Sequence, residues 1–210
     1  MELAIGDYNL SSWSMRPWLV LKRAGAPFTE RLVRLDQPDT HETILKHSPS
    51  GLVPALKVEG EVVWDSLAIC VWAAEHYPEA RLWPAGAHER WLARSATCEM
   101  HAGFAALRKQ CPMNLQRRTT VEPSAETAAD LRRLVELFTG MRERFGQQGP
   151  YLFGEWSMPD AFYTPVATRI RSYAIDLSVH GDEDGVAQAY VDALLEQPDF
   201  LEWERRALAE

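Results

Sequence analysis

The segment Ser11–Pro17, with the sequence SSWSMRP, places three hydroxyls and one arginine between an apolar stretch and a predicted helix. Ligands of open α/β sheets collect where a strand leads into a helix. The start of a helix presents unpaired N–H groups and partial positive charge, so it favours an anion, and a serine hydroxyl there donates a further hydrogen bond. The alternative is that Ser11 and Ser12 only cap the helix.

Two further segments carry groups that suit a ligand. At Val53-Pro54, a cis bond would leave the Val53 backbone free to pair with an extended, peptide-like ligand, whereas a trans bond, which base rates favour, would only mark the start of a strand. At Asp65-Ser66, the Ser66 hydroxyl and nearby N–H groups would hold a carboxylate, and Asp65 would accept an ammonium group. The alternative for Asp65-Ser66 is again helix capping. Together the two groups suit the α-amino-acid end of a ligand.

The first 80 or so residues, which must position these segments, alternate between strand and helix patterns. A helix is predicted to end before Gly25, because positive charge in a last turn followed by glycine is typical of a helix end. The predicted strands are 2–8, 28–35, 55–58 and 62–64, the last two forming a hairpin around Glu59-Gly60. The predicted helices are about 15–24, 40–46 and 66–76.

The pattern changes after Tyr77-Pro78, and no later segment indicates a strand. Pro84 and Gly86 interrupt the chain, so we predict an α/β domain over residues 1–80 and an all-α domain over residues 87–210. Ser157 and Asp160 have the spacing of a reciprocal helix cap, which is a folding signal. Helices are predicted at about 88–110, 124–145, 158–172, 187–196 and 200–209.

Composition excludes several classes of protein. The 210 residues carry a formal net charge of −8, which argues against a nucleic-acid-binding protein. The longest apolar run, Leu67 to Ala74, is far shorter than the roughly 20 residues of a membrane-spanning helix. The first residues, Met1 to Ile5, lack the basic and apolar regions of a secretory signal, so we expect a cytoplasmic protein. The three cysteines lack Cys-x-x-Cys spacing and the six histidines lack His-x-x-x-His spacing, so no redox dithiol and no metal site is predicted.

The order of the segments resembles the glutathione S-transferase family: a serine-rich turn, then Val53-Pro54, then Asp65-Ser66, then a helical second half. The resemblance implies a thioredoxin-like α/β N-terminal domain, an all-helical C-terminal domain and glutathione as co-substrate. Asp65 and Ser66 would hold its γ-glutamyl end, and the Val53 backbone would pair with its cysteinyl part. A hydroxyl near the first helix would face the sulfur and favour the thiolate, which would attack a small electrophile.

The resemblance leaves the choice of hydroxyl open between two serines. Counting four residues back from Arg16 gives Ser12 as the first choice, and Ser11 is the alternative. The pattern also looks like the zeta class, but Trp13 stands where that class has a cysteine, which weakens an assignment as an isomerase. Trp13 is expected in the wall of the electrophile pocket. Tyr8 is expected to end the first strand.

Further expectations concern the second substrate and the assembly. His101, Phe104 and Arg108 would share one helix face toward the cleft, or Phe104 would be core and the other two solvated. The resemblance implies a homodimer and a role in detoxification. The alternatives are a non-catalytic binding or assembly module of the same fold, and a glutathione-dependent isomerase or peroxidase.

Overall fold

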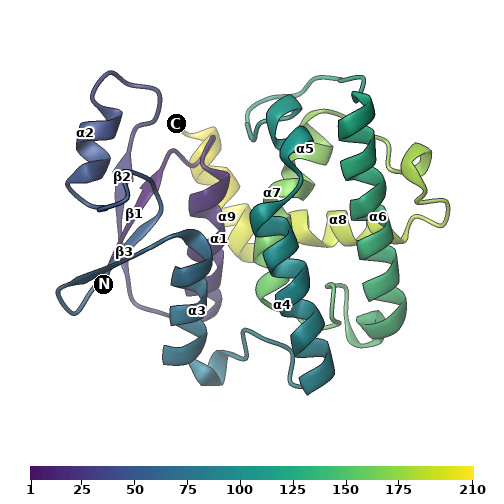
Figure 1. The fold of residues 1–210 in the computed structure, drawn as a ribbon, viewed down its shortest axis with the longest axis horizontal. Helices are drawn as coiled ribbons and strands as arrows, with labels where there is room; N and C mark the ends of the chain where they lie inside the picture. Colours follow the sequence, from purple (N-terminus) through teal and green to yellow (C-terminus); the bar gives the residue numbers. More distant parts are fainter.

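The first 76 residues form a four-stranded sheet and three helices in the computed structural model, which describes residues 1–210 (Figure 1). The strand order is β2-β1-β3-β4, with β1 and β2 parallel and the other pairs antiparallel. A β-α-β unit is therefore followed by a hairpin, as predicted. The elements are β1 (Glu2–Gly6), α1 (Ser12–Arg23), β2 (Thr29–Val33), α2 (Thr40–Leu45), β3 (Ala55–Val58), β4 (Glu61–Trp64) and α3 (Ser66–His76).

The rest of the chain is helical, which confirms the predicted fold class. A short 3₁₀ turn, η1 (Pro78–Ala80), precedes the bundle, and the only β-type pairing is a pair of isolated bridges within residues 151–155. The split into domains 1–80 and 87–210 stays a prediction. The bundle comprises α4 (Ala87–Ala102), α5 (Ala105–Gln110), α6 (Ala125–Phe145), η2 (Gly146–Gln148), α7 (Met158–Ser172), η3 (Ser178–His180), α8 (Val186–Glu196) and α9 (Pro198–Leu208).

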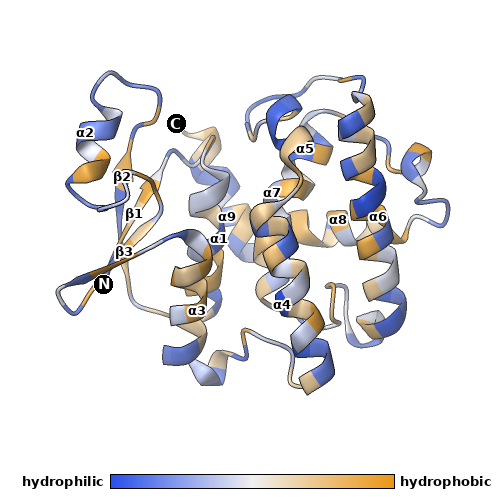
Figure 2. Ribbon diagram, viewed as in Figure 1, coloured by the Kyte–Doolittle hydropathy of each residue, from blue (hydrophilic) through white to orange (hydrophobic).

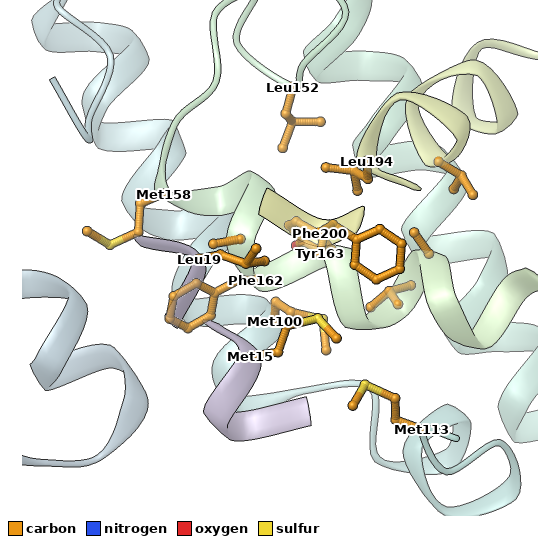
Figure 3. Close-up of a cluster of buried hydrophobic side chains, with 14 of the residues drawn as sticks. Met15, Leu19, Met100, Met113, Leu152, Met158, Phe162, Tyr163, Leu194 and Phe200 are labelled. Carbon is orange, nitrogen blue, oxygen red and sulfur yellow. The ribbon is translucent and has the colours of Figure 1, made fainter. Parts of the chain in front are cut away.

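Helix α1 lies between the sheet and the bundle, and it is buried along most of its length (Figure 1). Its Met15 and Leu19 side chains lie near Phe162 of α7 and Met100 of α4 (Figure 3). A single cluster of 45 buried hydrophobic residues runs through both halves. Each fully buried large side chain contributes about 1.5–3 kcal/mol, so packing around α1 holds the two halves together.

The outer helices bury one face each. In Figure 2, hydrophobic and hydrophilic residues are interleaved along α6, as expected for a helix with one buried side. The Ser157–Asp160 cap at the start of α7 forms as predicted, with the Ser157 N–H donating to Asp160 Oδ2 at 2.7 Å. None of the helices combines the length and the apolar character needed to cross a membrane.

Several predicted boundaries were wrong. Strand β1 stops at Gly6, because the Asp7 carbonyl accepts from the Leu10 and Ser11 N–H groups and starts a turn. Strand β2 stops at Val33, and the Leu35 N–H donates instead to the Asp7 carboxylate at 2.7 Å. The single helix predicted at 88–110 is two helices, α4 and α5.

Candidate active site

Three segments meet around one hollow of about 370 Å³, close to the point where α1 begins. They are the start of α1, the loop before β3 and the turn from β4 into α3. The structure therefore brings together five of the seven predicted site residues. Ser11 and Ser12 do not line the hollow but are buried directly before Trp13. The hollow is lined by Trp13, Ser50, Leu52, Val53, Pro54, Trp64, Asp65 and Ser66.

Val53 lines this hollow, and its backbone has no hydrogen-bond partner within the protein. The Val53–Pro54 bond is cis, contrary to the base-rate expectation for an isolated bond. Val53 lies outside β3, and neither its N–H nor its C=O takes part in a hydrogen bond within the protein. Backbone groups are nearly always paired when they are shielded from water. The free N–H and C=O of Val53 are therefore suited to pairing with an extended ligand.

Asp65 and Ser66 begin α3 in different ways. Asp65 has a positive φ of 76°, and its Oδ1 accepts from the N–H groups of Leu67 at 2.8 Å and Ala68 at 3.3 Å. Asp65 is therefore a helix cap as well as a wall of the hollow. The Ser66 hydroxyl is only 1% exposed and has no hydrogen-bond partner. A buried unpaired hydroxyl costs free energy, and an incoming acceptor would recover it.

The two serines before Trp13 have separate environments. Ser11 is the N-cap of α1, which is why the helix begins three residues earlier than predicted: its Oγ accepts from the Ser14 N–H and donates to Ser14 Oγ at 2.7 Å. Ser12 Oγ instead accepts a hydrogen bond of 3.2 Å from Arg169 Nη2, on helix α7. The Ser11 proton is thus engaged within the turn, whereas the Ser12 proton has no acceptor in the protein.

An unbalanced group of arginines lies behind Trp13. The Arg16 guanidinium is fully buried, its three nitrogens have no hydrogen-bond partner, and its Cζ lies 4.2 Å from the centre of the Trp13 ring. Arg108 approaches the same ring at 4.8 Å. Burial, reinforced by the Arg108 and Arg169 charges, lowers the pKa of Arg16 well below its ordinary value. The site therefore has a positively charged wall that favours a bound anion.

The prediction that His101, Phe104 and Arg108 share one helix face was wrong. Gly103 is extended and Phe104 has a φ of 58°, so the chain breaks between α4 and α5. Phe104 is buried in the core, as the alternative held. Arg108 and His101 are half-buried, and both contact Trp13, His101 with an edge-on ring at 5.3 Å.

His101 connects the helical half to the start of α3. Its Nε2 lies 3.4 Å from Asp65 Oδ2, and its Nδ1 is buried without a partner. Burial lowers the pKa of His101, an effect that the Asp65 carboxylate opposes. Asp65 therefore contacts residues of both halves: the start of α3 in the first half and His101 in the helical half.

Tyr8 lies away from this hollow. It follows β1 instead of ending it, and its hydroxyl contacts Glu30 and accepts from Arg206 Nη1 at 2.9 Å. Burial and the hydrogen bond to Glu30 raise the pKa of Tyr8 to about 12. The phenol therefore stays protonated and belongs to a link between β2, α1 and α9.

Comparison with known proteins agrees with this geometry. Residues 10–76, which contain all the segments around the hollow, match the family model for the glutathione S-transferase N-terminal domain. This matched part, about a third of the chain, is similar to the glutathione S-transferase N-terminal domain. The chain is 30% identical over 84 residues to maleylacetoacetate isomerase of Dictyostelium discoideum, a match that spans 40% of this chain and 38% of that protein.

Solved glutathione transferases share the whole fold. A glutathione transferase homologue from Burkholderia with bound glutathione has a TM-score of 0.71 at 19% identity, covering 100% of this chain and 99% of that one. A bacterial zeta-class maleylpyruvate isomerase has a TM-score of 0.74 at 22% identity, covering 97% and 96%. A sphingomonad glutathione S-transferase complexed with glutathione has a TM-score of 0.70 at 21% identity, with full coverage of both chains.

The buried arginines beside the hollow were not predicted as members of the site. Arg16 carried a signal, because it stands four residues after Ser12 and so on the same face of α1. Arg169 carried none: it reaches Ser12 from 157 positions away. No group of three or more His, Cys, Asp or Glu side chains is placed to hold a metal ion.

Proposed function

We propose that this chain is a glutathione transferase that ionises the glutathione thiol for attack on a small electrophile. The observation that carries the proposal is the convergence of unpaired groups on one hollow: the Val53 backbone and the Ser66 hydroxyl, beside a start of helix α1 backed by arginines. These groups fit a peptide-like anion. Two of the structural relatives are described with glutathione bound.

Each residue has a defined part in this proposal. The Ser66 hydroxyl donates to the γ-glutamyl carboxylate, and Asp65 accepts from the ammonium group. The Val53 backbone pairs with the cysteinyl portion. Ser12 donates to the sulfur, because its proton is free, whereas the Ser11 proton is used in the turn.

Ionisation of the thiol needs only a modest free energy. A free cysteine thiol has a pKa of about 8.5, and lowering it by about two units takes roughly 2.7 kcal/mol. One charge-assisted hydrogen bond and one helix end supply an amount of this order. The thiol proton passes to solvent, and the sulfur lone pair then forms the bond to the electrophile while its leaving group departs.

Calorimetry and kinetics test the proposal. Folded protein should release heat on titration with glutathione, and Ser12→Ala should lower conjugation of chlorodinitrobenzene by about 10- to 100-fold while retaining glutathione binding. Ser11→Ala is the matched control, expected to reduce stability through loss of a cap. No binding by folded protein would exclude the enzyme, and loss of activity in the Ser11 variant alone would reassign the hydroxyl.

A glutathione-dependent isomerase is the second candidate, because two of the relatives are named as isomerases. Trp13 in place of the zeta-class cysteine is the feature that weighs against it. Turnover of an unsaturated cis acid with catalytic, unconsumed glutathione would favour the isomerase, whereas stoichiometric consumption of glutathione would favour the transferase.

We further propose a cytoplasmic homodimer with a role in detoxification. The location is supported by three cysteines that are all free, as is usual in a reducing compartment. The homodimer is supported by the resemblance to glutathione S-transferases and by apolar side chains exposed on α3 and α4, where Val71 is 37% and Trp91 64% exposed. Sedimentation at micromolar concentration tests it, and Trp91→Glu should weaken a dimer that buries this part of α4.

A further inference from the structure

Arg169 is held in a fixed position by three hydrogen bonds. Its Nε donates to the Cys111 carbonyl at 3.0 Å and its Nη1 to the Pro165 carbonyl at 2.9 Å. Its Nη2 then reaches Ser12 Oγ at 3.2 Å. The planar guanidinium is thereby locked, and one N–H group points at the first residue of α1.

This contact fixes the direction of the Ser12 hydroxyl. A guanidinium has five donors and no acceptor, so Ser12 Oγ can only accept from Arg169. The Ser12 proton must point elsewhere, and no carbonyl or carboxylate of the protein takes it. A serine inside a helix would donate to the carbonyl four residues earlier, but Ser12 is the first residue of α1 and has no such helical carbonyl. The proton is left for a ligand.

The charge of Arg169 adds to this geometry. Arg169 is 3% exposed and takes part in none of the salt bridges of the protein. Burial, and the Arg108 charge after it, lower the pKa of Arg169 to about 10, so the guanidinium stays charged at neutral pH. A hydroxyl that accepts from a cation is a stronger donor to an anion.

We propose that Arg169 is a positioning residue of the helical half that makes Ser12 a one-way hydrogen-bond donor to the glutathione sulfur. The inference rests on the proposed transferase function. It assigns to α7 a part in ionising the thiol, in addition to its part in packing against α1. Arg169 acts through Ser12 and does not itself contact the reacting atoms.

The decisive readout is the pKa of bound glutathione, titrated through the ultraviolet absorbance of the thiolate. Arg169→Met should raise this pKa by about one unit and move the alkaline rise of kcat by the same amount, so kcat below the wild-type pKa falls about tenfold. The KM for glutathione should change less than about twofold, because the groups that hold the tripeptide are untouched. In a Ser12→Ala background the same substitution should have almost no effect.

Arg171→Met is the matched control. Arg171 lies on the same helix but pairs with Glu204, so its loss should lower stability without changing the thiol pKa. If Arg169→Met does not fold, Arg169→Lys is the deciding variant. Arg169 reaches its three acceptors with three separate nitrogens, and the single nitrogen of lysine cannot be near all of them, so the thiol pKa should still rise.

The outcomes separate this inference from the function on which it rests. If the wild type binds glutathione but shows no thiolate at all, or does not bind it, the proposed function fails. If the wild type forms the thiolate and the folded Arg169 variants leave its pKa unchanged, the inference is overturned. An equal shift with and without the Ser12 hydroxyl would also overturn it, because Arg169 would then act independently of Ser12.

Discussion

Replacement of Ser66 by alanine should separate ligand affinity from folding stability. The Ser66 hydroxyl is 1% exposed and unpaired in the protein. Its donation to a carboxylate is a charge-assisted hydrogen bond, for which about 1.5–3 kcal/mol is typical. Since each 1.4 kcal/mol is tenfold, Ser66→Ala should weaken glutathione binding by about 10- to 150-fold.

The same substitution should leave the ligand-free protein as stable as the wild type, or more stable. A buried unpaired polar group costs about 1–3 kcal/mol, and alanine removes the hydroxyl that incurs this cost. Most substitutions that abolish a hydrogen bond of the folded state have the opposite sign. The assays are isothermal titration with glutathione and urea denaturation without it.

Ser172→Ala provides a matched control. Ser172 is equally buried, but its hydroxyl donates to the Asn114 carbonyl at 3.1 Å, far from the hollow in sequence and on α7. Its removal should lower stability by about 1 kcal/mol and leave glutathione binding unchanged. The reasoning is refuted if Ser66→Ala lowers stability while glutathione affinity stays at the wild-type value.

Two further predictions concern stability. Glu30 accepts from Trp18 Nε1 at 2.6 Å and from Arg206 Nη1 at 2.6 Å, so Glu30→Gln should cost roughly 1–3 kcal/mol in urea denaturation, and a loss below about 0.5 kcal/mol would contradict this. Burial raises the pKa of Asp160 to about 6, so the folded state retains this proton above the unfolded pKa of about 3.9. Protonation of Asp160 therefore contributes to the free energy of unfolding below pH 4, and about 3 kcal/mol of this contribution is lost as the pH rises to 6. The Asp160→Asn variant should lack this part of the decline. Parallel profiles of unfolding free energy against pH for the two proteins would contradict the reasoning.

The boundaries of an element were predicted correctly where adjacent residues determine them. Helix α3 begins and ends where predicted, because Asp65 supplies a cap directly before an unbroken apolar run. The hairpin around Glu59-Gly60 also follows from adjacent residues, both with positive φ. The break in the helix predicted at 88–110 was missed because apolar residues continue beyond it, although Gly103 was a local warning.

The site could be predicted only in part, for a related reason. Three short segments indicated where a peptide-like ligand would be held, and each is a capping or turn motif readable by itself. The contacts of His101 with Asp65 and of Arg169 with Ser12 join α/β residues to residues of the bundle. No spacing along the chain encodes them, since they depend on how α1 packs against α4, α5 and α7.

In the proposed enzyme, the two halves of the chain supply residues with different roles. The groups that would hold the tripeptide, Val53 and Ser66, come from the first half, whereas Arg108 and Arg169, which add positive charge near the sulfur, come from the bundle. Changes in the packing between α1 and α7 should therefore act on the thiol pKa more than on affinity for glutathione. The uncompensated charge of Arg16 lies at the junction of the two halves, against Trp13 on one side and Phe162 on the other. Burial of a guanidinium charge that has no carboxylate partner costs free energy. A bound thiolate or an acidic ligand would offset that cost.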